Sequence, residues 1–197
     1  MSNTNTINLT GERRWKSADK MEAFVRDCLR NRQNFFENHW IDERGRGRFL
    51  HMMAATIPGQ YDEAGHGVDI FAMDAVATGR SIWVIEVSRG IPGGAGTFKG
   101  GGKSVKYAGG QLQMSAAWRE AATAKFLERD DAADKIRCLL DVSEKDDGRA
   151  KTMFLSAFLR HRKAVIVPEG CHFDTRGTDI DFRTEVYTFP LPRGLGE

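Results

Sequence analysis

The sequence has few cysteines and no long apolar run. Its three cysteines, Cys28, Cys138 and Cys171, lie far apart and form no CxxC pair. This spacing argues against a zinc ribbon or a disulfide framework and favours reduced thiols. No apolar stretch approaches the roughly 18 to 20 residues of a membrane-spanning helix. The polar N-terminus, MSNTNTINLTGERRW, lacks the apolar core of a secretory signal. We therefore expect a soluble, cytoplasmic protein.

The sequence also lacks a large excess of positive or negative charge. The 197 residues include 29 Lys and Arg against 27 Asp and Glu, a net charge of +2, which excludes a strongly basic arm or an acidic tail as the main feature. An apolar share of 41% is enough for one hydrophobic core. We expect a single domain over residues 1–197, with residues 1–16 and 190–197 as flexible termini.

Hydrophobic periodicity and turn residues divide the chain into alternating helical and extended segments. They predict helices over 17–40 and 111–129, a chain break at Pro58–Gly59, a β-hairpin from the runs 67–73 and 82–88, a loop over 143–151, and strands over 163–168 and 186–189. The segment 153–160 fits either a strand or a short helix. This order predicts an α/β (α+β) domain built around one mixed sheet.

Glycine is concentrated in one segment. Nine of the 21 glycines lie between Gly90 and Gly110, together with Lys99, Lys103 and Lys106 and no acidic residue. Flexible backbone amides with cationic side chains suit a polyanion such as a nucleic-acid backbone. A solvated linker would have the same composition. We expect the segment to pass over the cleft that contains the candidate site and to have little secondary structure.

Two carboxylates interrupt the β-prone runs, Asp69 in GVDIFAM and Glu86 in IWVIEVS. A charge within an apolar strand is costly unless it is paired or bound to a cation. If the two strands pair, both side chains can project from one face and converge. Such a pair fits Mg²⁺ or Mn²⁺. The alternative is structural: Glu86 pairs with Arg80 or Arg89, and Asp69 caps a turn.

An Asp in one strand and a Glu 17 residues later at the end of the next resemble the PD-(D/E)xK nuclease superfamily. The run VIEVSRG, the glycine-rich segment and GGQLQMSAAW are similar to the polymorphic nuclease toxins of interbacterial competition. The resemblance covers about residues 60–120, and its matching positions are Gly67, Asp69, Glu86, Gly90, Gln113, Met114, Ser115 and Trp118.

The resemblance implies a restriction-endonuclease-like fold, a mixed central sheet flanked by helices. It implies a metal-dependent nuclease, with DNA the favoured substrate, acting as an antibacterial toxin or in defence. Asp69, Glu86 and the backbone carbonyl of Val87 would hold Mg²⁺ or Mn²⁺, and Gln113 would contact water or phosphate. A toxin of this kind implies a cognate immunity protein as partner, and delivery into a target cell by a route that needs no signal peptide.

The chain departs from the family pattern at Ser88, where the family has its catalytic lysine. A serine cannot supply a cation, so Lys103, Lys99 or Arg89 would have to replace the lysine. Alternatively, the chain is a catalytically degenerate module that binds nucleic acid or a partner protein.

Three further assignments concern the third acid, His66 and Trp118. The superfamily often takes a third acid from its N-terminal helix, and Glu22 and Glu37 are the choices here. His66 precedes the GVD run and either lies in a loop or contacts substrate. Trp118 lies on the apolar stripe of its helix, so we expect it in the core rather than stacked on a base.

Overall fold

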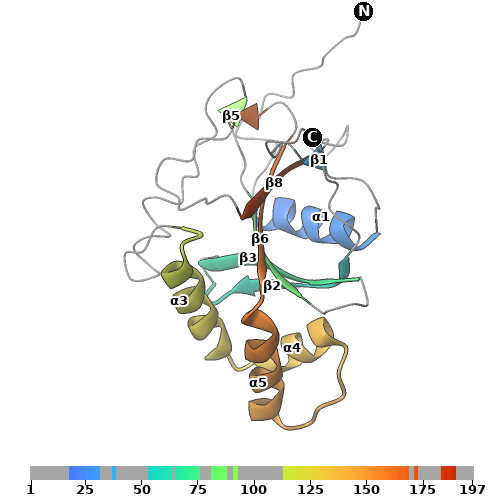
Figure 1. Ribbon diagram of the computed structural model, residues 1–197, viewed down its shortest axis with the longest axis vertical. Helices are drawn as coiled ribbons and strands as arrows, with labels where there is room; N and C mark the ends of the chain where they lie inside the picture. Colours follow the sequence, from blue (N-terminus) through green and yellow to red (C-terminus); the bar gives the residue numbers. More distant parts are fainter. Residues whose placement is uncertain are drawn as a thin grey trace, which may run out of the picture.

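The computed structural model describes residues 18–31, 37–38, 53–63, 65–75, 81–87, 91–92, 113–168, 171–172 and 183–189. Along this part of the chain the elements are α1 (Ala18–Asn31), β1 (Glu37–Asn38), β2 (Met53–Gln60), β3 (Gly67–Asp74), β4 (Ile82–Val87), β5 (Ile91–Pro92), α3 (Ala116–Leu127), α4 (Ala132–Leu140), α5 (Asp147–Phe158), β6 (Arg162–Pro168), β7 (Cys171–His172) and β8 (Thr184–Phe189). Figure 1 shows their arrangement.

The strands form one mixed sheet in the order β1-β8-β6-β4-β3-β2, and β5 pairs separately with β7. Strands β2, β3 and β4 are antiparallel neighbours, whereas β6 runs parallel to both β4 and β8. The predicted α+β class and the predicted hairpin, which is β3–β4, are therefore confirmed. The register pairs Ile70 with Ile85 and Phe71 with Val84.

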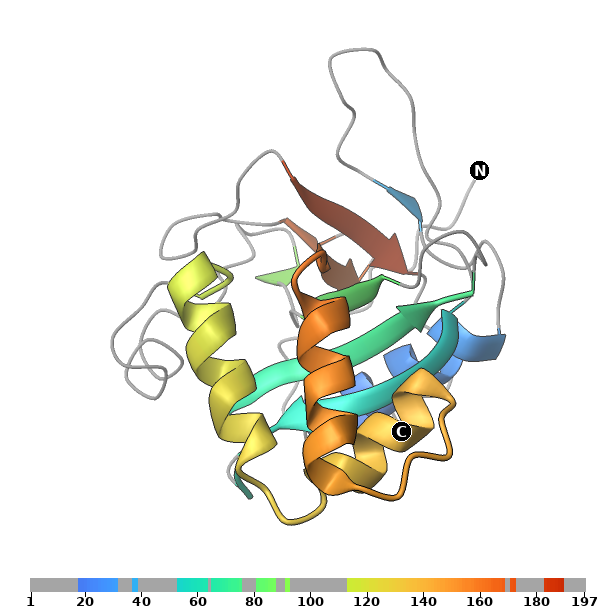
Figure 2. The same ribbon diagram turned by 60° about the horizontal axis from the view of Figure 1, so that its bottom comes forward.

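Helices cover both faces of the sheet, with α1 on one face and α3, α4 and α5 on the other (Figure 2). Because side chains alternate along a strand, β3 and β4 each contribute side chains to both hydrophobic cores, one on each face of the sheet. The core under α1 includes Met21, Val25, Leu29, Ile70, Trp83 and Ile85. The core under the other helices includes Phe71, Val84, Trp118, Phe126 and Phe154. Trp118 is thus a core residue, as its position on the apolar stripe predicts.

The predicted break at Pro58–Gly59 is wrong, because β2 continues through both residues. β2 is an edge strand, where proline is tolerated, and the register with β3 shifts between these two residues. A Cβ on Gly59 would lie 2.7 Å from the Phe71 ring and 2.7 Å from the Val68 carbonyl oxygen. The glycine therefore allows close packing across the hairpin.

The first predicted helix is too long. Helix α1 ends at Asn31, and Glu37 and Asn38 form β1, which requires extended backbone to pair with Thr188 and Tyr187 of β8. The rest of the predicted range, like the termini 1–16 and 190–197, lies outside the described residues.

The predicted loop over 143–151 is also too long, because α5 begins at Asp147. The Asp146 side chain accepts a hydrogen bond of 2.7 Å from the Arg149 amide, which caps the helix at its start. Ala150, Phe154 and Phe158 are then buried at a helical spacing of four. This periodicity also resolves the segment 153–160 as mainly helical.

Among the described residues, no helix combines the length and the apolar character that crossing a membrane requires. Among the described residues, Cys28 is buried and Cys138 is exposed, and neither is in a disulfide.

Candidate functional site

Asp69 and Glu86 lie next to each other on β3 and β4. The Asp69 amide donates a hydrogen bond of 3.2 Å to Glu86 Oε1. In the other direction, the Val87 amide donates one of 2.7 Å to Asp69 Oδ2. The pairing of the two strands therefore places the two acids side by side, near the start of β3 and the end of β4.

The Glu86 carboxyl is almost completely enclosed, at 1% exposure. Its pKa is raised well above the ordinary value for glutamate, first because burial disfavours the charged form, and then because Asp69 and Glu22 are negative neighbours. The Gln113 side-chain amide donates to Glu86 Oε2 and partly offsets these effects. A buried acid beside two other acids is the arrangement that a cation would stabilise most.

The third acid is supplied by α1. Glu22 is 8% exposed and accepts a hydrogen bond from Gln60 Nε2, which also donates one of 3.3 Å to the Asp69 carbonyl oxygen. Gln60 of β2 therefore links Glu22 to the strand that carries Asp69. Of the two candidates from the sequence, Glu22 reaches the carboxylate pair, whereas Glu37 lies in β1 at the far edge of the sheet.

Gln113 precedes α3 instead of belonging to it, so the helix predicted from residue 111 begins later than expected, at Ala116. Met114, which lies within the predicted helical range but before α3, has φ 66°. This left-handed conformation costs energy in a residue that carries a side chain. The Met114 carbonyl accepts a hydrogen bond from Arg119, and Ser115 caps the helix by accepting from the Trp118 amide. This irregular turn directs Gln113 towards Glu86.

The chemistry of the donors fits a hard cation such as Mg²⁺ or Mn²⁺. The three carboxylates offer only oxygen, and Gln113 Oε1 is a buried oxygen with no hydrogen-bond partner among the described residues. Within that part of the chain, no group of three or more His, Cys, Asp or Glu side chains is arranged to hold a metal ion. Oxygen type and burial thus suit the ion, but the side chains are engaged with amides instead.

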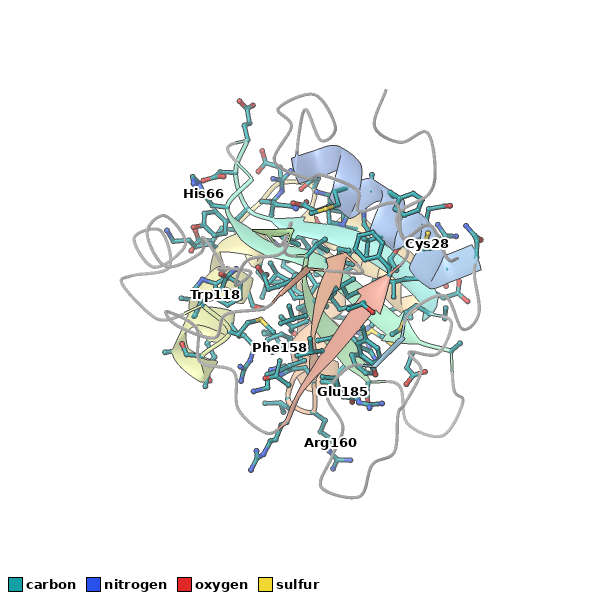
Figure 3. All side chains as sticks on the ribbon, turned by 90° about the horizontal axis from the view of Figure 1, so that it is seen from above. Cys28, His66, Trp118, Phe158, Arg160 and Glu185 are labelled. Atoms are coloured by element: carbon teal, nitrogen blue, oxygen red, sulfur yellow. The ribbon has the colours of Figure 1, made fainter. Side chains whose placement is uncertain are left out.

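His66 lies in the turn between β2 and β3 and is labelled in Figure 3. Its amide and ring both contact Asp62, with distances of 2.9 Å and 2.7 Å to the two carboxylate oxygens. Contact of His66 with substrate stays a prediction.

Several expected site residues lie outside the described residues: Ser88, Arg89, Lys99 and Lys103. The expected path of the glycine-rich segment over the cleft is also untested, since only Ile91 and Pro92 of it are described, as β5. Of Val87, the structure gives the amide bonded to Asp69 and a buried side chain.

Two residues of the site were not found from the sequence. Gln60 is the one side-chain amide in the run MAATIPGQ. Because a chain break was predicted at Pro58–Gly59, Gln60 was not expected to lie in a strand. Arg119 is a charged residue directly after Trp118 on the buried stripe of α3; a cation in that position is the signal that could have identified it.

Comparison of the chain with models of known protein families, with curated proteins and with solved structures gave no match.

Proposed function

We propose that the protein is a metal-dependent nuclease of the PD-(D/E)xK type, with a restriction-endonuclease-like core, Mg²⁺ or Mn²⁺ as cofactor and DNA as the favoured substrate. The observation that carries the proposal is the buried Glu86 beside Asp69 and Glu22. Asp69 lies beside Glu86 across the β3–β4 pair, and Glu22 of α1 adds to the negative charge near it, so a charged Glu86 costs stability unless a cation is present.

The surrounding architecture supports the same assignment. A mixed sheet with helices on both faces is what the family resemblance implies for the fold. The hairpin β3–β4 brings together the two acids that the resemblance names, and Gln113, which the resemblance also names, bonds to Glu86 from the turn before α3.

Each residue has a distinct part in the proposed reaction. A metal ion in such a site lowers the pKa of a bound water and offsets charge on the scissile phosphate. Asp69, oriented by the Val87 amide, would bind the ion, and Glu86 and Glu22 would supply further oxygen atoms. Gln113 orients Glu86 and, through Oε1, can bind water or a phosphate oxygen.

The biological setting in this proposal is that of an antibacterial toxin or a defence nuclease. A toxin of this type would require a cognate immunity protein in the producing cell. This part rests on the resemblance of the motifs around Glu86 and Gln113.

Cleavage of a supercoiled plasmid tests the activity directly. We expect nicking with Mg²⁺ or Mn²⁺, none with EDTA, and a loss of at least about a hundredfold in the isosteric variant Glu86→Gln, because a lost metal ligand removes transition-state stabilisation. Glu128→Gln, at an exposed acid after α3, is the matched control. Full activity in Glu86→Gln would overturn the proposal. Binding of plasmid without cleavage by the wild type would favour the degenerate module instead.

A further inference from the structure

The turn before α3 is held in a conformation that its own residues do not favour. Met114 has φ 66°, and its side chain is buried. A methionine stays in the left-handed region only where the surrounding structure enforces it. Because rotation about this φ turns the preceding residue relative to the helix, whatever holds the angle also sets the direction of Gln113.

Arg119, in the first turn of α3, supplies that restraint. Its Nη1 donates a hydrogen bond to the Met114 carbonyl oxygen, and its backbone amide donates one of 3.0 Å to the Ser115 carbonyl oxygen. Only 9% of Arg119 is exposed, although arginine is usually a surface residue. The side chain and the backbone of Arg119 thus bind the carbonyl groups of two successive residues of the turn.

Arg119 is held in its turn by His161, which lies between α5 and β6. Arg119 Nε donates to His161 Nε2 at 2.7 Å, and His161 Nδ1 lies 2.7 Å from the Phe158 carbonyl oxygen. Because a carbonyl only accepts and a guanidinium only donates, Nδ1 carries the proton and Nε2 is the acceptor. The imidazole also stacks on the Phe158 ring, with centroids 4.3 Å apart, so its orientation is fixed from two sides.

Arginine suits this position because its two acceptors belong to different segments of the chain. The guanidinium is planar and permanently charged, and its nitrogens donate in a fixed arrangement. Nε and Nη1 therefore bond to His161 and to Met114 at the same time. A lysine has one donor nitrogen on a flexible stem and cannot reproduce both contacts with the same geometry.

The Gln113 side chain shows the effect of the restraint. Gln113 is 5% exposed, its Nε2 donates to Glu86 Oε2, and its Oε1 has no hydrogen-bond partner among the described residues. A buried carbonyl oxygen without a donor costs free energy, so a side chain that could turn freely would bring it to a donor or to water. The hydrogen bond to Glu86 and the backbone that carries the side chain must together impose this orientation.

We propose that Arg119 is a positioning residue, which fixes the turn before α3 and thereby holds the Gln113 amide against Glu86. His161 is the support on which this restraint depends, so the segment between α5 and β6 is coupled to the acid on β4. The restraint itself needs no assumption about the reaction, whereas its effect on cleavage rests on the proposed function.

Exchange of the Gln113 side-chain amide protons, followed by nitrogen–proton NMR, tests the positioning without any activity. The signal that disappears in Gln113→Leu assigns the amide. A buried amide bonded to a carboxylate is protected from exchange with deuterium, and we expect Arg119→Met to lower this protection by at least about tenfold. Arg119→Lys, which keeps the charge but not the two-point contact, should lower it as well.

Two kinds of variant separate positioning from a general loss of stability. Phe126→Leu, two turns further along α3, weakens the buried packing of the same helix and is the matched control, which should keep the protection. His161→Gln offers a side-chain oxygen to Arg119 and should keep most of it, whereas His161→Leu should lose it. If Arg119→Met does not fold, this pair decides the outcome. Protection in His161→Leu equal to that in the control overturns the proposal.

Plasmid cleavage then measures whether Arg119 acts through Gln113. We expect Arg119→Met and Gln113→Leu each to lower kcat by about tenfold or more, because small displacements at a reacting centre are costly. The double variant should lose no more than Gln113→Leu alone, since the two residues act as a unit; additive losses overturn the proposal. If the wild type never cleaves but the amide protection responds as expected, the positioning stands and the nuclease function fails. If the wild type cleaves and the protection does not respond, the positioning fails and the nuclease function stands.

Discussion

The Asp69 amide donates to Glu86 Oε1 while the Asp69 carboxylate accepts from the Val87 amide. Each acid is thus held by the backbone of the opposite strand. The arrangement therefore holds two acidic side chains next to each other. The backbone hydrogen bonds relieve only part of the repulsion between them, because the Glu86 pKa is still raised. The fold gives up stability at this point, and such a cost is typical of a functional site.

The first prediction concerns that cost. Because the Glu86 pKa is raised in the folded chain, the native state binds the proton more tightly than the unfolded state does. The contribution of Glu86 to stability is therefore fully present below the ordinary glutamate pKa of about 4.5 and is lost as the pH rises through the raised value. Glu86→Gln removes this loss: its side-chain oxygen can still accept from the Asp69 amide, and its NH₂ group can donate to Gln113 Oε1 once the Gln113 amide turns over.

We therefore expect Glu86→Gln to be more stable than the wild type at pH 8 and nearly equal to it at pH 4. In a domain of this size, a change of 1 kcal/mol in the free energy of unfolding shifts the Tm by about 2–4 °C. Thermal unfolding at both pH values measures this shift. Glu128→Gln at the exposed surface should show no such divergence. A Glu86→Gln variant less stable than the wild type at pH 8 would contradict the inferred repulsion.

The second prediction distinguishes the two candidates for the third acid. Glu22→Gln should lower plasmid cleavage by at least about tenfold, because Glu22 is buried and acts on the charge of Glu86. Glu37→Gln should leave cleavage unchanged, because β1 is separated from β4 by β8 and β6. Equal effects of the two variants would remove Glu22 from the site.

The carboxylate pair could be predicted from the sequence because its signal is local. Asp69 and Glu86 each stand alone among apolar β-formers, and the alternation of strand side chains places them on a common face once the strands pair. The choice of Glu22 could not be predicted, since it depends on how α1 packs across β2, β3 and β4. Before that packing is known, Glu22 and Glu37 both lie near apolar residues.

Gln60 and Arg119 show a second kind of limit. Pro58–Gly59 has the local character of a turn, and only the position of β2 at the sheet edge makes a strand possible there. Arg119 lies on a helix face that periodicity assigns to the core. Its role depends on His161, 42 residues later, a contact with no sequence pattern.

The third prediction concerns His161. Its pKa is lowered in the folded chain, so the unfolded state binds the proton more readily. The contribution of His161 to stability is complete above about pH 6.5, the ordinary value of its pKa, and is lost as the pH drops through the lowered value. Protonation also removes the acceptor of Arg119. Urea unfolding at pH 7.5 and at pH 5.0 measures the free energy of unfolding. From the higher to the lower pH, we expect the wild type to lose about 1 kcal/mol more of it than His161→Gln does. An equal loss in the two proteins would exclude His161 as the cause.

The last prediction addresses the cation that the family takes from the position of Ser88. In an active nuclease a cation must approach the reacting phosphate, because the transition state spreads negative charge that a serine cannot offset. We favour Lys103 over Lys99, since it lies closer in sequence to Gln113, whose amide bonds to Glu86. Lys103→Ala should lower cleavage by about a hundredfold or more, comparable to the loss of one preorganised donor, whereas Ser88→Ala should have little effect. Plasmid nicking with Mg²⁺ or Mn²⁺ measures both. If Lys99, Lys103 and Arg89 can all be replaced without loss, this account of the chemistry is wrong; if the wild type is inactive and Ser88→Lys creates cleavage, the chain is a degenerate nuclease that binds without cutting.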